Sequence, residues 1–191
     1  VQMLLSLAPD RVSLYGYAHV PWMARRQSLI PTDALPTPEE RLALFEAAQV
    51  LFKRDGYQEI GIDHFAKPDE GLAQAARTGH LRRNFQGYTD DTCDVLLGLG
   101  ASSISRFPQG YAQNASATSA YQKAVRAGDF ATGRGHAFTS DDRLRGRMIE
   151  ALMCDFRINT AELVDQYGAD PTQIAQIYQT ALAAFPGMVA K

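Results

Sequence analysis

The fold is decided by residues 37–66, TPEERLALFEAAQVLFKRDGYQEIGIDHFA, in which a helical pattern gives way to a strand-like one. Thr37 precedes a proline and two acids, which is typical of a helix N-terminus with threonine as the N-cap. Apolar residues then recur at helical spacing until Gly56. Residues 57–66 follow at once with strand-like composition. The stretch therefore predicts a helix joined directly to a strand.

The same alternation extends to both sides of this stretch. Residues 11–20 read as a strand that ends near Ala18, and residues 68–79 read as a short helix. Alternating strands and helices argue for parallel βα units rather than hairpins. In parallel α/β folds the chemistry sits at the carboxyl ends of the strands. Those ends are expected at residues 17–19 and 63–65.

The chain changes character near residue 115. Residues 94–105, DVLLGLGASSIS, form an apolar run with two glycines. Four helices are then predicted, three of them with capping residues at their start: 116–128, 139–156, 159–168 and 170–185. The sequence therefore predicts an α/β part over residues 1–115 and a helical part over residues 116–191.

Composition limits the possible functions. The chain has 191 residues, of which 46% are hydrophobic and 21% charged, and a formal net charge of −2. This charge gives no argument for binding nucleic acid or an anionic membrane. No apolar run approaches the ~18 residues of a membrane span, and no signal peptide is recognisable. Two cysteines make no disulfide framework, so we expect a cytoplasmic protein.

The ends of the chain suggest a fragment. The sequence starts at Val1 without an initiator methionine, and it stops at the residues GMVAK just after a predicted helix. We therefore expect a piece cut from a longer protein.

Histidine and aspartate offer few candidates for catalysis or metal binding. The four histidines, at 19, 64, 80 and 136, show no metal-ligand spacing. Asp63 and His64 could form an acid/base pair at a strand end. Adjacent strand residues point to opposite faces, however, so a structural role with one of them bonding backbone is equally compatible.

Glycine and cysteine motifs are also ambiguous. Gly98 and Gly100 fit the start of a phosphate-binding loop, but the third glycine is absent, and a close backbone approach explains them equally well. Cys154 lies at helical spacing with apolar residues and is expected in a core. Cys93 lies among acids that should raise its thiol pKa, so it is a poor candidate nucleophile.

Several motifs together resemble one family. They are GIDHFAKPDEGLAQAARTGHLRRNFQGYT at 61–89, LLGLGASSIS at 96–105 and YAQN at 111–114, with YGYAHVPW, LPTPEERLALF and MIEALMCDFRI elsewhere. The chain closely resembles the oxygen-independent coproporphyrinogen III oxidases, radical S-adenosylmethionine (SAM) enzymes of haem biosynthesis. The resemblance implies the back half of a partial (βα)6 barrel over residues 1–115, followed by a truncated helical C-terminal domain over residues 116–191.

The resemblance also implies a chemistry and its partners. The family uses a [4Fe-4S] cluster and two SAM molecules to convert two propionates of coproporphyrinogen III to vinyls through a 5′-deoxyadenosyl radical, giving protoporphyrinogen IX. A reduced flavodoxin-type electron donor and a monomeric state are implied for the full-length protein. The family's Cys-x-x-x-Cys-x-x-Cys motif is absent here, so the cluster-binding half is expected to be missing and the isolated piece inactive.

The resemblance assigns site residues individually. Ala18 and Ile104 match positions that contact SAM, and Phe85 and Gln86 match residues lining the active-site cavity near the second SAM or the substrate. Such a cavity must exclude water and hold one C–H bond beside the radical, so shape matters more than acids and bases. No catalytic residue and no metal ligand is assigned to this chain.

Two alternatives remain open at the level of sequence. The related haem chaperones share the barrel, although their counterpart of the NFQGYT segment lacks the Phe-Gln pair. Residues 116–191 could instead form an independent helical module that binds a partner protein.

Overall fold

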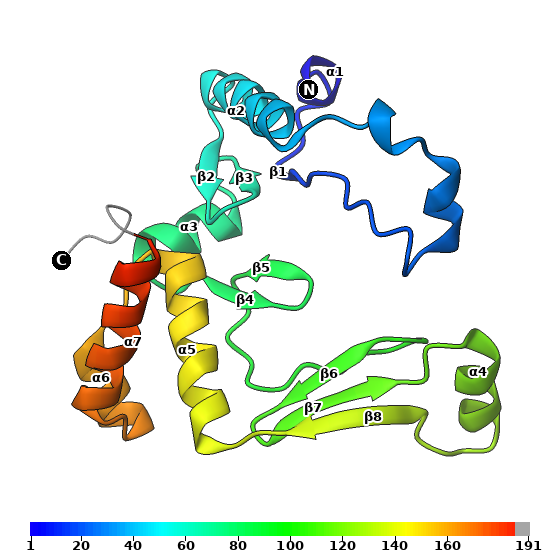
Figure 1. Cartoon of the computed structure of the whole chain (residues 1–191), viewed down its shortest axis with the longest axis vertical. Coiled ribbons are helices and arrows are strands. Elements are labelled where there is room, and N and C mark those ends of the chain that lie inside the picture. Colours follow the sequence, from blue (N-terminus) through cyan, green and yellow to red (C-terminus); the bar gives the residue numbers. More distant parts are fainter. Residues whose placement is uncertain (186–191) are drawn as a thin grey trace. The chain divides into compact units, whose positions relative to one another are not determined.

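A computed structural model of the chain describes residues 1–185, and the predicted end at GMVAK lies outside the described residues. The chain divides into two compact units, Val1–Asp90 and Asp91–Lys191. The predicted boundary at residue 115 lies inside the second unit, and as a domain boundary of the longer protein it stays a prediction. Each unit contains both helices and strands (Figure 1).

The first unit is built from short elements. Its helices and strands are α1 (Gln2–Leu5), β1 (Arg11–Ser13), two 3-10 helices (Arg25–Leu29 and Thr32–Ala34), α2 (Pro38–Arg54), β2 (Gln58–Ile60), β3 (His64–Ala66), α3 (Gly71–Thr78), β4 (Arg82–Asn84) and β5 (Gly87–Thr89). A three-stranded sheet has the order β1-β3-β2, and β4 and β5 form a separate hairpin.

The two helices predicted in this unit are confirmed. Thr37 caps α2 through a capping box, because its side chain accepts a hydrogen bond from the Glu40 amide and the Glu40 carboxylate accepts one from the Thr37 amide. Helix α3 ends at Gly79, which adopts the left-handed conformation with φ 72°.

The prediction of parallel βα units is wrong for this sheet. Strand β3 pairs antiparallel with both neighbours, with Val12 and Glu59 each opposite Phe65. The predicted strand over 57–66 is broken into β2 and β3, because Gly61 adopts φ +59° and turns the chain back. Strand β1 ends at Ser13 rather than near Ala18, since the three-residue β3 offers no partner beyond that position.

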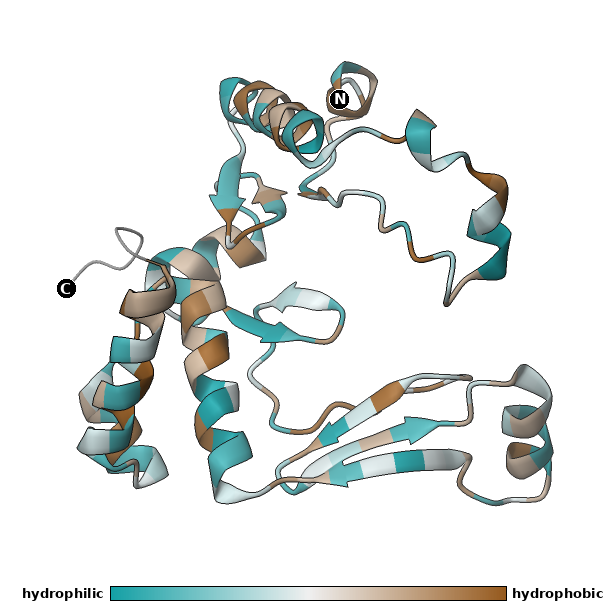
Figure 2. Cartoon of the chain, in the orientation of Figure 1, coloured by the Kyte–Doolittle hydropathy of each residue, from teal (hydrophilic) through white to brown (hydrophobic). Residues whose placement is uncertain are grey.

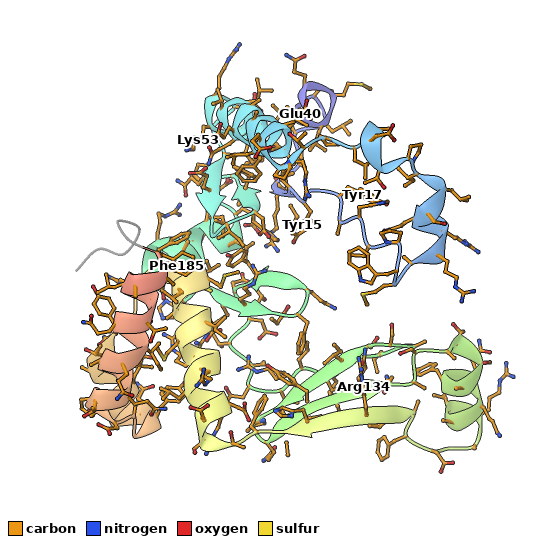
Figure 3. The ribbon with its side chains drawn as sticks, viewed as in Figure 1. Tyr15, Tyr17, Glu40, Lys53, Arg134 and Phe185 are labelled. Atoms are coloured by element: carbon orange, nitrogen blue, oxygen red, sulfur yellow. The ribbon has the colours of Figure 1, made fainter. Side chains whose placement is uncertain are left out.

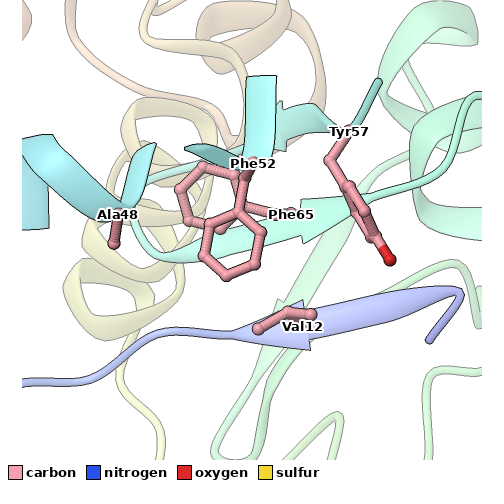
Figure 4. Packing of buried hydrophobic residues seen from close by; sticks show 5 residues of the cluster. All are labelled: Val12, Ala48, Phe52, Tyr57 and Phe65. Atoms are coloured by element: carbon pink, nitrogen blue, oxygen red, sulfur yellow. The ribbon is translucent and has the colours of Figure 1, made fainter. Parts of the chain in front are cut away.

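Aromatic residues fill the core between α2 and this sheet. Phe52 is fully buried, and its ring stacks on Phe65 with centroids 4.6 Å apart while Tyr57 meets it edge-on at 5.8 Å. Val12 and Ala48 complete the cluster (Figure 4). Burial of this helix face fixes α2 over the sheet.

The second unit combines a sheet with a group of helices. Its elements are β6 (Ile104–Phe107), β7 (Gly110–Asn114), α4 (Thr118–Arg126), β8 (Thr132–Ala137), α5 (Ser140–Asp155), α6 (Thr160–Tyr167) and α7 (Pro171–Ala184). The strands form an antiparallel sheet of order β6-β7-β8. Sequence reasoning missed these strands: every residue of β8 is exposed, so no apolar alternation marks it.

The helices of this unit are confirmed, with N-caps at Thr139, Asn159 and Asp170. Apolar residues along α5, α6 and α7 lie among hydrophilic ones (Figure 2) and pack together at Leu144, Met148, Leu163, Ala169 and Ile174. Arg147 of α5 also binds Glu162 of α6 through two hydrogen bonds, at 2.6 and 3.2 Å, and this carboxylate raises the pKa of the guanidinium. These contacts join the helices into one group.

The aromatic core predicts a large difference between two positions of α2. We expect Phe52→Ala to lower the free energy of unfolding by about 3–5 kcal/mol, because it leaves a cavity in the packed core. Leu42→Ala, on the 59% exposed Leu42 of the same helix, should change it by less than about 0.5 kcal/mol. Urea unfolding of both variants checks this, and equal losses would contradict the placement of the core.

Gly61 provides a second test with a matched control. An alanine Cβ at Gly61 would overlap the phenol of Tyr88, whereas at Gly56 it would meet nothing within 4 Å. Both glycines have positive φ, so either alanine costs about 1–2 kcal/mol of backbone strain. The overlap should add about 1–3 kcal/mol at Gly61 only. Urea unfolding in which the two variants were equally destabilised would show that Tyr88 does not pack there.

Candidate functional site

His64 lies at the centre of a hydrogen-bonded chain of three side chains in the first unit. Its Nδ1 is 2.6 Å from Asp63 Oδ1, and its Nε2 is 2.8 Å from Ser13 Oγ. The side chains of His64 and Asp63 are only 6% and 14% exposed. A buried imidazole whose two nitrogens both have partners avoids the cost of an unsatisfied polar group.

The pairing of Asp63 with His64 corrects one sequence argument. Alternation along a strand was expected to separate the two side chains. Asp63 instead lies in the turn before β3, and only His64 belongs to the strand. The alternation rule therefore does not apply to this pair, and the two side chains meet directly.

Two tyrosines surround the imidazole. Tyr88 meets the His64 ring edge-on, with centroids 5.1 Å apart and an interplanar angle of 84°. Tyr15 does so at 6.0 Å and 81°. The Tyr88 hydroxyl also accepts a hydrogen bond of 3.1 Å from the Ile62 amide, and the Arg83 guanidinium lies 4.6 Å from the Tyr88 ring centroid. Tyr88 thus ties the hairpin to the turn between β2 and β3.

Gly87 brings the hairpin backbone against His64. A Cβ at this position would lie 3.1 Å from His64 Cε1, 3.2 Å from its Nε2 and 3.5 Å from the Tyr15 hydroxyl. Gly87 is buried and has φ +133°, a conformation that L side chains rarely adopt. The glycine of the NFQGYT motif therefore serves a close contact between the hairpin and the DHFA segment.

Phe85 and Gln86 form the two-residue turn of this hairpin, between β4 and β5. Asn84 orders the turn, because its Oδ1 accepts a hydrogen bond of 2.8 Å from the Gln86 amide. Phe85 is 51% exposed and Gln86 is exposed. The two side chains predicted to face a ligand thus project at the tip of a hairpin whose base contacts His64.

Ala18 lies in the exposed segment that follows β1. Its carbonyl accepts a hydrogen bond of 3.1 Å from Gln27 Nε2. A cavity of about 610 Å³ is lined by residues of the segments 14–19, 32–37 and 41–45, including both neighbours of Ala18, Tyr17 and His19. Figure 3 shows Tyr15 and Tyr17 along this segment. The lining of this cavity does not include Ala18, Phe85 or Gln86.

Ile104 belongs to the second unit, where it begins β6 and pairs with Gln113 of β7. Gly98 lies beside it, because a Cβ at Gly98 would come within 2.7 Å of the Ile104 carbonyl oxygen. Of the two explanations for the Gly98–Gly100 motif, the structure confirms the close approach of neighbouring backbones. The geometry brings together Phe85 and Gln86, while Ala18 and Ile104 lie in separate segments.

The cysteines do not provide a cluster site on this chain. Cys154 is buried in α5, as expected for a core residue, and Cys93 is exposed. Within residues 1–185, no group of three or more His, Cys, Asp or Glu side chains is arranged to hold a metal ion. A cluster bound by three thiolates cannot be held by two cysteines alone, so the residues present do not fit that group.

A separate survey of the helices concerns membranes. None of those within residues 1–185 is long and apolar enough to cross a bilayer.

Sequence reasoning missed Ser13, Tyr15 and Tyr88 as neighbours of His64. Ser13 is 51 residues away from His64 along the chain, and nothing in the local pattern of either segment connects them. The signals that could have pointed to the contact are the glycines at 61 and 87, which permit close approach.

The expected effect of acids on Cys93 is confirmed and leads to a pH-dependent prediction. The carboxylate of Asp91, by hydrogen bonding to the thiol and then by its charge, raises the pKa of Cys93, and Asp94 contributes least. Asp91→Asn should therefore lower this pKa and increase the thiolate fraction at pH 8 several-fold. Alkylation of Cys93 by iodoacetamide should be correspondingly faster. Asp94→Asn is the matched control, and an equal acceleration in both variants would contradict the assignment to Asp91.

Comparison with known proteins gives strong similarity over nearly the whole chain. No family model matches. An oxygen-independent coproporphyrinogen III oxidase from Paracoccus denitrificans is 62% identical over 189 residues, which cover 99% of this chain. Proteins of the same name from Cereibacter sphaeroides and Escherichia coli are 56% and 40% identical, over 99% and 87% of the chain. The chain spans 42%, 42% and 36% of the length of these three relatives.

A solved structure agrees with these relatives. The coproporphyrinogen III oxidase HemN from Escherichia coli, described as a radical SAM enzyme, matches with a TM-score of 0.87 and 37% identity. The match covers 96% of this chain and 42% of that one. The chain is therefore homologous to the oxygen-independent coproporphyrinogen III oxidases and corresponds to about 42% of their length.

Proposed function

We propose that this chain is part of an oxygen-independent coproporphyrinogen III oxidase, which converts two propionates of coproporphyrinogen III to vinyls and yields protoporphyrinogen IX. The observation that carries this proposal is 62% identity over 189 residues to a protein of that name. The matched relatives quoted above all carry this name, which favours the oxidase over the haem-chaperone alternative.

The cofactors divide between this chain and the remainder of a longer protein. The similarity to a radical SAM enzyme implies a [4Fe-4S] cluster and SAM. With two cysteines, this chain supplies no complete set of thiolate ligands, so a cluster must be held by residues outside it. SAM, when bound in the complete enzyme, supplies the radical that removes hydrogen from the propionate. The residues of this chain contribute binding surface and exclude water.

We assign that surface to the hairpin tip first. Phe85 can pack a ring or an apolar face of a ligand, and Gln86 can both donate and accept hydrogen bonds. Both are exposed on a turn whose base is fixed against His64. This combination of accessible tip and rigid base supports a role in the cavity that holds the second SAM or the substrate.

Ala18 and Ile104 are proposed to contact SAM. Ala18 is exposed and small, so a nucleoside could approach its backbone closely, and its neighbours Tyr17 and His19 line a cavity. Ile104 is half-buried at the start of β6 and offers an apolar surface. A reduced flavodoxin-type electron donor, a cytoplasmic location and a monomeric full-length enzyme complete the proposal.

A chimeric enzyme tests the proposed function. The residues of this chain would replace the matching 189 residues of the Paracoccus denitrificans relative. Under anaerobic reducing conditions with SAM, we expect the chimera to form protoporphyrinogen IX from coproporphyrinogen III. A chimera that folds and binds its cluster but forms no vinyl product would contradict the proposal.

Phe85 gives the same experiment a residue-level test. In the chimera, Phe85→Ala should lower kcat/KM by at least about tenfold, which corresponds to about 1.4 kcal/mol of lost transition-state stabilisation. Phe130→Ala is the matched control, since Phe130 is 97% exposed and belongs to no assigned site. Equal activity of the two variants would remove Phe85 from the active site.

A further inference from the structure

His64 is held more rigidly than a surface imidazole could be. The Asp63 carboxylate only accepts hydrogen bonds, so the imidazole Nδ1 carries the hydrogen of that contact. In the neutral ring, Nε2 then accepts from the Ser13 hydroxyl. The two bonds run from opposite sides of the ring, and they fix both its tautomer and its plane.

The hairpin rests on this fixed ring. Gly87 approaches the Cε1–Nε2 edge of His64, and Tyr88 meets the ring edge-on. Strand β5 pairs with β4 in a tight register, with Asn84 opposite Gly87 across the two-residue turn. A shift of Gly87 therefore displaces Phe85 and Gln86, because no flexible residue separates them.

We propose that His64 is a positioning residue, which holds the β4–β5 hairpin so that Phe85 and Gln86 present their side chains in one fixed place. Asp63 and Ser13 act through it by orienting the imidazole. The ligand that the tip meets, SAM or the porphyrinogen, rests on the proposed function, whereas the mechanical link between His64 and the hairpin does not.

Removal of the imidazole should loosen the hairpin locally. His64→Leu removes both polar contacts and leaves the Asp63 carboxylate, which is 14% exposed, without its partner. His64→Gln keeps an amide that can reach one of the two partners, so it should have a smaller effect. His80→Gln is the matched control, because His80 is exposed and lies just before β4, with its Nδ1 3.1 Å from Thr78 Oγ1.

Hydrogen–deuterium exchange of the chimera measures this link directly. We expect the peptide covering residues 82–89 to exchange at least about tenfold faster in His64→Leu. His64→Gln should show an intermediate acceleration, and His80→Gln none, while peptides from α2 keep their rate. If His64→Leu unfolds the protein, so that the α2 peptides also exchange faster, His64→Gln decides. Unchanged exchange of the hairpin in a folded His64 variant overturns the proposal.

Steady-state kinetics of the same variants separate this proposal from the proposed function. A displaced tip should raise KM for SAM or for coproporphyrinogen III several-fold in His64→Gln, with no change in His80→Gln. Faster exchange without any change in KM would support the positioning role and contradict the ligand contacts assigned to Phe85 and Gln86. An inactive chimera whose hairpin exchange still responds to His64 would contradict the proposed function alone.

Discussion

The arrangement around the candidate site depends on one constraint, the need of a buried imidazole for partners at both nitrogens. His64 meets it with Asp63 from the preceding turn and with Ser13 from β1. The ring so fixed becomes a surface against which Gly87 and Tyr88 pack. The short β1, β3 and hairpin strands have few backbone hydrogen bonds of their own, so side-chain contacts of this kind matter more to their placement than they would in a long-stranded sheet.

Sequence reasoning succeeded where the signal is local. The capping box at Thr37, the left-handed Gly79 and the caps of α5 to α7 are encoded within a few residues of each helix end. The direction of strand pairing is not encoded in this way. The alternation of strands and helices favoured parallel units, and the antiparallel β1-β3-β2 sheet shows that a three-residue strand can pair in either direction after a helix.

The site divides in the same manner. Resemblance to a family marked Phe85 and Gln86, and the structure locates them at a hairpin turn whose composition alone suggested only an unusual loop. Ser13, Tyr15 and Tyr88 could not be connected to His64 from the sequence, because each contact joins segments that are distant along the chain or depends on a glycine's missing side chain. The DHFA and NFQGYT motifs thus form two sides of one contact.

The central claim is that this contact exists between the DHFA strand and the hairpin. Nuclear Overhauser spectroscopy on the isotope-labelled chain tests it most directly. The account predicts cross-peaks from His64 Hε1 to the Gly87 Hα protons and to the Tyr88 ring, together with a single imidazole tautomer protonated at Nδ1. A folded chain that shows no cross-peak between His64 and Gly87, and an imidazole that exchanges between tautomers, would contradict it.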